Sequence, residues 1–410
     1  MAAPRCRFCD AELSETFVDL GMSPLSNAFL TADRLEAMEP FYPLHAQVCG
    51  RCFLVQLQAF ERPESIFGDY AYFSSYSDTW LAHCRAYVET VLERCPLPPG
   101  GRVVEIASND GYLLQYFQQR GIEVLGIEPA RNVAQAAVAK GIPTETVFFG
   151  TETARRLVER GLGASLLVGN NVLAHVPDLN DFVAGLKILL DPDGILTMEF
   201  PHVARLMEFN QFDTVYHEHF SYFSFRTAEQ VFHRHGLTLF DVEELPTHGG
   251  SLRIWGCHAE AARPKEERVG RILAFEAERG LDGLEPYRAF GEQVKRAKRD
   301  ILAFLIDARR QGRTVVGYGA PAKGNTLLNY CGIRTDLIDF TVDRSPEKQG
   351  KFLPGTHIPV YAPERIAQVK PDYVFILPWN LRDEITGQMG HVREWGGRFV
   401  VPIPTVEVIP

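Results

Sequence analysis

Residues 102–110 read RVVEIASND and are followed by Gly111 and by YLLQYFQQRG at 112–121. RVVEI is an apolar run with the length of a buried strand, and the segment after Gly111 has the apolar spacing of an amphipathic helix. The residues SNDG between them favour a tight turn that leads into the helix. This stretch therefore predicts a strand, a turn and a helix, the unit from which parallel α/β sheets are built.

The same alternation continues along the chain. VLGIEPA at 124–130 predicts a second strand, which ends at Glu128, and SLLVGNNVLAHVPD at 165–178 contains a third. The helical segment FVAGLKILL (182–190), the turn DPDG and the strand ILTMEF (195–200) come next. Strands and helices at this spacing predict an α/β fold with a mostly parallel, doubly wound sheet, in which ligands bind at the carboxyl ends of the strands.

The turn after the first strand is rich in acidic residues. Nicotinamide-binding proteins usually carry G-x-G-x-x-G at this point, whereas Glu105 to Gly111 read EIASNDG. Acidic groups repel a pyrophosphate, and Glu105 and Asp110 would instead attract a sulfonium or an ammonium group. Glu128 at the end of the next strand has the position from which an acid binds two ribose hydroxyls. Each acid alone could also be a solvated loop carboxylate, and the combination favours a cationic cofactor.

Length and composition restrict the class of protein. A chain of 410 residues exceeds one ordinary core, and we expect three domains. The net charge is −10 and no long Lys/Arg-rich run is present, so we expect no nucleic-acid partner. The sequence contains neither a signal peptide nor a stretch of about 20 apolar residues, so we expect a cytoplasmic protein without a membrane partner.

Four of the eight cysteines form two C-x-x-C pairs, Cys6 with Cys9 and Cys49 with Cys52. Two such pairs can offer four thiolates to one tetrahedral Zn²⁺, although the gap between them exceeds the usual spacing of about 15 to 20 residues. The alternative is a set of free thiols. Four sulfur ligands leave no open coordination position, so the predicted zinc would be structural.

A second nucleotide-type unit follows a helical, charged stretch that begins near residue 251. TVVGYG at 314–319 predicts a strand, APAKGNTLLNY a turn and a helix, and LIDFTVD a strand that ends at Asp343. GYGAPAKG lacks the G-K-[ST] of a P-loop. Its backbone N–H groups and Lys323 can still bind phosphate oxygens, and the alternative is a tight turn without a ligand.

YHEHFSYF at 216–223 places His217, Glu218 and His219 among aromatic residues. Burial of titratable groups among rings shifts their pKa values and needs compensation by partners or by chemistry. The stretch is therefore either a well-paired core segment or an acid/base site.

Several motifs together resemble a known family. EIASNDGYLL, GIEPARNVA, NNVLAHVPDLNDF and DPDGIL are similar to class I S-adenosylmethionine-dependent methyltransferases. With the paired C-x-x-C motifs, YHEHFSYFS, THGGSLRIW and GYGAPAKGNT, they resemble the three-domain C-methyltransferases that act on nucleotide-linked keto-deoxysugars, of which the TDP-sugar C-3-methyltransferases are the best known. The resemblance extends over essentially the whole chain.

The resemblance implies a domain organisation and a reaction. We expect a zinc-binding domain at 1–68, a methyltransferase domain at 69–250 and a Rossmann-like nucleotide-sugar-binding domain at 251–410. The expected reaction transfers a methyl group from S-adenosylmethionine to C-3, beside the C-4 ketone of a TDP-linked deoxysugar that feeds antibiotic or surface-glycan synthesis. The expected cofactor-binding residues are Glu105, Ser108, Asn109, Gly111, Glu128 and Asn171.

The resemblance also implies roles in catalysis. His219 is the leading candidate for the base, with Glu218 to orient or tune it and Tyr216 to donate to the developing oxyanion, while Glu218 and His175 remain alternative bases. On a straight strand His219 would face away from Tyr216, so this assignment requires a bend. His217 is interpreted as structural. Tyr70 completes the expected catalytic set, and the expected substrate-binding residues are Tyr72, Tyr76, Ser251, Arg253, Gly319, Lys323 and Asn325.

Several alternatives stay open at this point. Arg253 could form an ordinary surface ion pair, and His175 could serve only to pack the start of a helix. The two nucleotide-type units also suit a nicotinamide-dependent nucleotide-sugar oxidoreductase, and the paired cysteines suit a non-catalytic zinc-containing scaffold. The substituent at C-3, the nucleotide base, the stereochemical outcome and the oligomeric state are left open.

Overall fold

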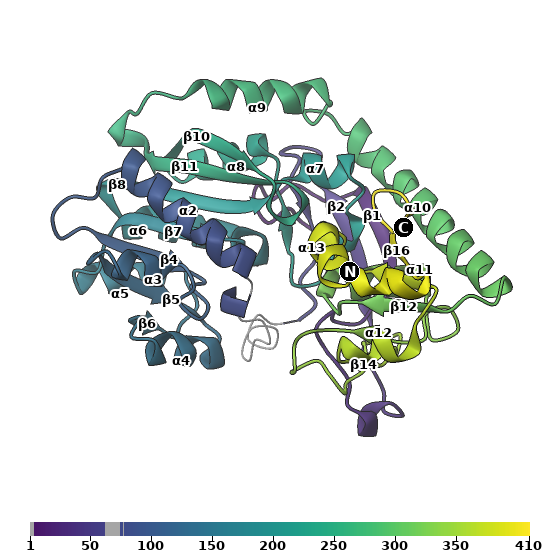
Figure 1. The fold of residues 1–410 in the computed structure, drawn as a ribbon. Helices are drawn as coiled ribbons and strands as arrows, with labels where there is room; N and C mark the ends of the chain where they lie inside the picture. Colours follow the sequence, from purple (N-terminus) through teal and green to yellow (C-terminus); the bar gives the residue numbers. More distant parts are fainter. Residues whose placement is uncertain (1–3, 62–73, 77) are drawn as a thin grey trace.

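The computed structural model describes residues 4–61, 74–76 and 78–410. Within these ranges the strands form three sheets, one of four, one of seven and one of six strands. Figure 1 shows the small sheet, in purple, between the two larger α/β units. No helix in the described ranges combines the length and the apolar character that a membrane span requires.

The seven-stranded sheet contains the expected strand–turn–helix unit. Its strand order is β10-β11-β8-β7-β4-β5-β6, and of these strands only β11 runs antiparallel to its neighbours. The strands are β4 (Arg102–Ile106), β5 (Glu123–Ile127), β6 (Thr144–Glu145), β7 (Ala164–Asn170), β8 (Leu190–Pro201), β10 (Leu237–Leu245) and β11 (Ser251–His258). The helices are α2 (Asp78–Arg94), α3 (Leu114–Gln118), α4 (Arg131–Ala139), α5 (Thr151–Glu159), α6 (Leu179–Leu189), α7 (Val203–Glu208) and α8 (Phe225–Arg234). The predicted doubly wound sheet is confirmed.

Two local expectations differ from the structure. The helix after Gly111 is short, because α3 begins only at Leu114 and ends at Gln118. The DPDG segment, expected as a turn, lies inside β8, where the pairing with β7 shifts register between Ala164 and Leu166. The extra residues are accommodated by this irregularity, so the strand continues without a separate loop.

The six-stranded sheet confirms the second nucleotide-type unit. Its order is β14-β13-β12-β15-β16-β17, parallel except for the last strand. The strands are β12 (Val315–Tyr318), β13 (Thr341–Val342), β14 (Val360–Tyr361), β15 (Tyr373–Ile376), β16 (Arg398–Val401) and β17 (Glu407–Ile409). The helices are α11 (Ala322–Cys331), α12 (Glu364–Val369) and α13 (Arg382–Gln388), preceded by α9 (Glu267–Glu278) and α10 (Glu285–Arg310).

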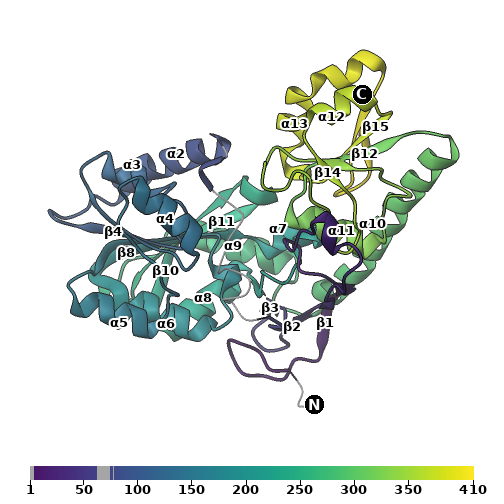
Figure 2. The ribbon, with the colours of Figure 1, turned by 90° about the horizontal axis from the view of Figure 1, so that it is seen from below.

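The four-stranded sheet joins the two larger units. It contains β1 (Glu15–Ser23), β2 (Tyr42–Val48) and β3 (Val55–Gln56), and its fourth strand is β9 (Ser221–Tyr222) from the YHEHFSYF segment. Figure 2 shows β1, β2 and β3 beside both units. Phe17 of β1 stacks on Phe290 of α10 at a centroid distance of 4.6 Å, whereas Cys52 and Leu54 belong to the core of the seven-stranded unit. The N-terminal region is therefore built into both neighbouring cores.

The expected boundary between residues 250 and 251 falls inside one sheet. Gly249 and Gly250 lie in the connection between β10 and β11, and Ser251, the first residue of β11, pairs with Leu245 and with Pro201 of β8. Because β11 lies between β8 and β10, β10 would not be hydrogen-bonded to the rest of the sheet without it. We therefore propose that the methyltransferase unit extends through His258.

Candidate active site and metal centre

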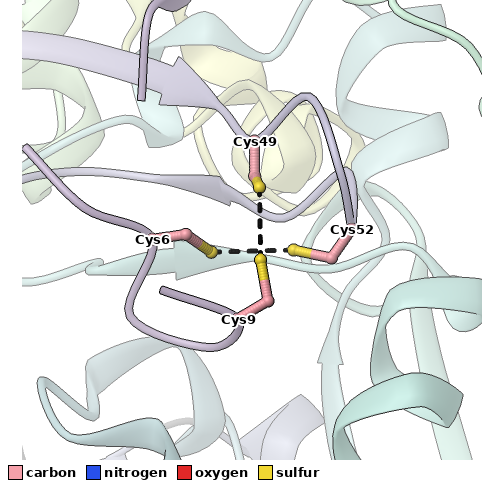
Figure 3. Close-up of side chains that lie close together, drawn as sticks. All are labelled: Cys6, Cys9, Cys49 and Cys52. Atoms are coloured by element: carbon pink, nitrogen blue, oxygen red, sulfur yellow. Dashed lines mark hydrogen bonds between the residues drawn. The ribbon is translucent and has the colours of Figure 1, made fainter. Parts of the chain in front are cut away.

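The four cysteine sulfurs of the paired C-x-x-C motifs surround one point, as Figure 3 shows. All four lie within 4.8 Å of one another, and the Cys6–Cys52 and Cys9–Cys49 sulfur distances are 3.6 and 3.5 Å. Tetrahedral Zn–S bonds of about 2.3 Å separate the sulfurs by about 3.8 Å. The four thiolates therefore fit one structural zinc ion and leave no ligand position for a substrate.

Two tight turns present these sulfurs. The Asp10 N–H donates to the Cys6 carbonyl at 2.9 Å, and the Phe53 N–H donates to the Cys49 carbonyl at 3.0 Å. Donors also face the sulfurs: the Gln56 side-chain amide lies 3.2 Å from the Cys6 sulfur and the Arg51 N–H lies 3.4 Å from the Cys49 sulfur. Donors of this kind stabilise metal-bound thiolates and fix their orientation.

The expected cofactor-binding residues gather at the carboxyl ends of the neighbouring strands β5, β4 and β7. Glu128 is buried and accepts hydrogen bonds from the backbone N–H groups of Asn109 and Ala130, at 2.9 and 2.8 Å. Each of its oxygens keeps a second lone pair, so the carboxylate can still accept from two ribose hydroxyls. Its position matches the expected one.

Glu105 is a buried acid that forms no ion pair with the residues that the structure describes. Burial raises the pKa of Glu105 well above its usual range, and the nearby Tyr112 hydroxyl opposes this only in part. Within the described residues neither of its oxygens accepts a well-formed hydrogen bond, and the same holds for the buried Ser108 hydroxyl and for the side-chain oxygen of Asn171. Unsatisfied polar groups gathered at strand ends are typical of a site that a polar ligand completes. A cationic cofactor fits these groups.

The turn SNDG has the backbone geometry that this site needs. Asn109 and Gly111 have positive φ values of 48° and 76°, and a Cβ on Gly111 would lie 2.9 Å from Ile142. Asp110 differs from the expectation: its carboxylate pairs with Lys140 at 2.9 Å. The charge of Asp110 is therefore largely neutralised, which leaves Glu105 as the acid that faces a cationic ligand.

YHEHFSYF contains the bend that the catalytic assignment requires. The His219 N–H donates to the Tyr216 carbonyl at 2.9 Å and closes a turn, so the two rings lie on the same side with centroids 4.0 Å apart. The ring of His217 points elsewhere: its Nε2 lies 3.2 Å from the Pro43 carbonyl and its ring meets Tyr42 edge-on. His217 thus packs against the N-terminal sheet, as expected of a structural residue.

His219 is held as a neutral imidazole. Its Nδ1 lies 2.9 Å from the Thr214 carbonyl, which can only accept, so Nδ1 carries the proton and Nε2 keeps its lone pair. Burial, followed by the influence of His175, holds the pKa of His219 well below its usual range. The ring of His175 meets that of His219 edge-on at 4.7 Å, and burial lowers the pKa of His175 to about 4.

Glu218 faces the N-terminal region. The side-chain amide of Asn27 donates to Glu218 at 2.6 Å, and burial raises the pKa of Glu218 to about 7. Asn325 of α11 donates to the carbonyl of Ser26, the neighbour of Asn27, also at 2.6 Å. All three parts of the chain therefore contribute to the surroundings of the turn.

Lys323 approaches the site from the C-terminal unit. It donates to Asn380, lies 4.5 Å from the centroid of the Trp379 ring, and burial lowers its pKa to about 8. Trp379 donates to Asp213 at 2.7 Å, one residue before the Thr214 carbonyl that holds His219. Gly319 of the GYGAPAKG turn has φ +88°, and a Cβ there would lie 2.5 Å from Pro378.

Two expected substrate-binding residues have partners within the protein. Arg253 donates to Glu199 at 2.7 Å and to Glu243 at 3.4 Å, so the ion-pair alternative describes it, although the pair is buried and not on the surface. The Ser251 hydroxyl donates to the Thr247 carbonyl at 3.0 Å. We therefore withdraw Arg253 as a phosphate ligand.

Tyr70 and Tyr72 lie outside the described residues, and Tyr76 ends the short 3-10 helix η2 (Ser74–Tyr76). Sequence reasoning missed His83 of α2, which lies 2.9 Å from Glu199, and His248, whose Nε2 lies 3.1 Å from the Asn171 side chain. The left-handed φ of 54° at His248, in the sequence THGG, is the kind of strain that gathers at functional sites.

Comparison with known proteins shows the family. Family models match in three successive segments: a zinc binding domain at residues 6–67, a methyltransferase domain at 80–242 and the C-methyltransferase C-terminal domain at 246–404. The C-methyltransferase NovU of Streptomyces niveus is 38% identical over 404 residues, which cover 98% of this chain and 96% of that protein. A ubiquinone biosynthesis O-methyltransferase of Bartonella bacilliformis is 24% identical over 128 residues, 30% of this chain and 51% of that protein.

Similar solved structures are also found. A SAM-dependent methyltransferase from Anabaena variabilis is 16% identical and covers 50% of this chain and 99% of its own, with a TM-score of 0.37. The magnesium protoporphyrin IX methyltransferase of Synechocystis PCC 6803 with bound S-adenosylmethionine is 16% identical and covers 48% of this chain and 88% of its own, with a TM-score of 0.34.

The matches settle the class of enzyme and its cofactors. The full-length relative is a C-methyltransferase, and the methyltransferase model matches residues 80–242, which include Glu105 and Glu128. The oxidoreductase and scaffold alternatives are therefore excluded. With S-adenosylmethionine as cofactor and zinc at the cysteine cluster, the chain belongs to the family of three-domain S-adenosylmethionine-dependent C-methyltransferases.

Proposed function

We propose that this enzyme methylates C-3 of a TDP-linked 4-keto-deoxysugar through an enolate. The observation that carries the proposal is the hydrogen bond between Nδ1 of His219 and the Thr214 carbonyl, which leaves Nε2 as a buried proton acceptor. A carbon has no lone pair with which to attack a methyl donor. A base that removes the proton beside a ketone supplies the missing electron pair.

The residues around His219 have matching tasks. Nε2 of His219 takes the C-3 proton, and the electron pair moves into the C-4 carbonyl to form the enolate. The hydroxyl of Tyr216, whose ring lies against that of His219, donates to the enolate oxygen. His175, which meets His219 edge-on, is neutral and adds no competing charge. Glu218, anchored by Asn27, orients the turn.

S-adenosylmethionine, when bound, supplies the electrophilic methyl group. Glu105 attracts its positive charge, and Glu128 accepts from its ribose hydroxyls. Ser108, Asn109, Gly111 and Asn171 are proposed to complete the same cofactor site: three of them have positive φ values, and the Ser108 hydroxyl and the Asn171 side-chain oxygen lack hydrogen-bond partners among the described residues.

The C-terminal unit is proposed to hold the nucleotide portion of the substrate. Gly319 lies in the connection between β12 and α11, and Lys323 and Asn325 lie in the first turn of α11, where the N–H groups of a helix start and a lysine favour phosphate oxygens. Lys323 has one hydrogen-bond acceptor among the described residues, Asn380, so donors remain for a diphosphate. Tyr70, Tyr72 and Tyr76 remain predicted pocket residues, and the cytoplasmic location and the absence of nucleic-acid partners remain predictions.

A panel of nucleotide-linked 4-keto-deoxysugars tests this proposal. Each sugar is incubated with the enzyme and methyl-labelled S-adenosylmethionine, and transfer is measured by mass spectrometry. We expect label in a TDP-linked 4-ketosugar and none in its 4-hydroxyl analogue, because only the ketone acidifies C-3. Equal labelling of both sugars would contradict the enolate mechanism.

A further inference from the structure

Arg7 lies between two of the metal ligands, in the sequence Cys6-Arg7-Phe8-Cys9, and its side chain turns into the protein. Its Nη1 donates to the Pro177 carbonyl at 2.9 Å, and its Nη2 donates to the Leu57 carbonyl. The guanidinium also lies 5.4 Å from the centroid of the Phe220 ring. One planar cation therefore contacts three separate stretches of the chain.

Two of these stretches carry the active-site histidines. Pro177 follows His175 by two residues, and Phe220 directly follows His219. The Leu57 N–H donates to the Phe220 carbonyl at 3.0 Å, and the Phe220 N–H donates to the Ala174 carbonyl at 2.7 Å. The guanidinium is thus fixed to both backbone segments that bring the rings of His175 and His219 to within 4.7 Å of each other.

Through Gln56, the backbone of Arg7 is connected both to the cysteine cluster and to β9, the strand that follows His219. The Arg7 N–H donates to the Gln56 side-chain oxygen at 2.9 Å, and the amide nitrogen of the same side chain lies 3.2 Å from the Cys6 sulfur. In the sheet Gln56 pairs with Ser221 of β9. Asn180 donates to the Arg7 carbonyl at 2.9 Å. A continuous set of contacts therefore joins a metal ligand to the segment that contains His219.

We propose that Arg7 is a positioning residue for methyl transfer. Arg7 is held by the rigid cysteine cluster and, through its contacts, sets the placement of His175 and His219. The inference rests on the proposed role of His219. Its consequence is that a residue of the zinc-binding region affects the chemical step without contact with substrate. Loss of a group that orients an active-site residue costs about 10- to 100-fold in activity.

The sequence offers a matched control two residues away. Arg5 is also an arginine of the first cysteine turn, but it is exposed and pairs with Asp10 at 2.7 Å. The test compares Arg7→Met with Arg5→Met in the full chain. The measurements are kcat, KM, the Kd for S-adenosylmethionine, zinc content, and amide hydrogen exchange of residues 214–223.

We expect Arg7→Met to lower kcat about 10- to 100-fold and to speed exchange at 214–223. Zinc content and cofactor Kd should stay within about 2-fold of the original enzyme, because the sulfurs and the Glu128 region are untouched. Arg5→Met should change none of these quantities. Arg7→Lys, which keeps a cation on a single donor nitrogen, should recover part of kcat. Arg7→Gln, which lacks the charge and is too short to reach both carbonyls, replaces Arg7→Met in the comparison if that variant loses zinc.

The inference is overturned if Arg7→Met, or Arg7→Gln in its place, keeps the original kcat and exchange protection. It is also overturned if cofactor binding falls in parallel with kcat, since that outcome marks general destabilisation. Failure of the proposed function would look different: His219→Asn would keep its activity, while Arg7→Met would still loosen residues 214–223.

Discussion

The side chain of Asn27 donates a hydrogen bond of 2.6 Å to Glu218, across 191 residues of sequence. Asn27 belongs to the loop after β1, and Glu218 belongs to the turn that also carries His219. This contact brings the N-terminal region into the active site. It also determines how readily Glu218 ionises, because a hydrogen bond to a carboxylate stabilises its charged form.

Replacement of Asn27 should change the pH dependence of the reaction. Burial raises the pKa of Glu218 to about 7, and the hydrogen bond from Asn27 lowers it. Asn27→Leu removes only the lowering contribution, so the pKa of Glu218 rises further and the carboxylate forms at higher pH. We expect the limb of the kcat/KM profile near pH 7 to move up by about one unit, since a hydrogen bond to a charged group contributes about 1.5 kcal/mol. In a Glu218→Gln background the same substitution should leave the pH profile of kcat/KM unchanged. A shift of the profile in that background would show that Asn27 acts on another group.

His219→Asn should lower kcat about 100-fold or more, the usual scale for loss of a general base. The Kd for S-adenosylmethionine should change little, because the proposed cofactor contacts come from Glu105 and Glu128 and not from His219. His217→Asn is the matched control, since His217 points to Pro43 and not to His175. If the two variants lose activity equally, His219 is not the base, and the role passes to Glu218, His175 or a tyrosine.

Glu105 and Asp110 should differ in their effect on cofactor binding. Glu105→Gln removes a carboxyl group that can ionise when the cationic cofactor binds, and we expect about 10-fold weaker binding of S-adenosylmethionine. Asp110→Asn should change affinity by less than about 2-fold, because Lys140 already neutralises Asp110. Both constants can be measured by calorimetry.

The same calorimetry reports the ionisation of Glu105. Burial raises its pKa in the free protein, and a cationic ligand favours the charged form. Cofactor binding should therefore release a proton, so affinity falls as the pH is lowered. Binding heats in two buffers of different ionisation enthalpy measure the release, and its absence in Glu105→Gln assigns it. Equal release in both proteins would argue against Glu105 as the acid that faces the cofactor.

Metal analysis of protein purified without added metal should find about one zinc ion per chain. Cys49→Ser should lose the ion and unfold at a lower temperature, because the four sulfurs join two distant turns. Cys84→Ser is a suitable comparison, since Cys84 is a buried cysteine outside the cluster. Protein without zinc but with unchanged unfolding temperature would remove the metal from the account.

The sequence predicts those parts of the fold that depend on local pattern. RVVEIASND forms a strand and a turn because its apolar run is buried on both faces of β4, and the C-x-x-C pairs form tight turns that local hydrogen bonds close. The bend at Tyr216–His219 was required by the family resemblance and is present. The bend lies in a short turn in which neighbouring polar side chains point to different sides. Neither the helical period nor the strand period predicts such an arrangement.

Long-range partners were beyond this kind of reasoning. The sequence around Arg253 does not indicate that this arginine forms an ion pair with Glu199 of the neighbouring strand. The sequence around Asn27 likewise gives no sign of its hydrogen bond to Glu218. The boundary expected between residues 250 and 251 directly follows the pair Gly249 and Gly250, which is well suited to the turn of a hairpin. The alternation in LTLFDVEEL and SLRIWGCH was the available signal for β10 and β11.

The central claim is that His219 makes C-3 of the sugar nucleophilic. Its most direct test is an NMR experiment in deuterium oxide with a TDP-linked 4-ketosugar and S-adenosylhomocysteine in place of the methyl donor. The account predicts that the original enzyme exchanges the C-3 hydrogen for deuterium, that His219→Asn does not, and that the active donor then places its methyl group on C-3. A C-3 hydrogen that never exchanges, together with a methyl group on oxygen or nitrogen, would contradict it.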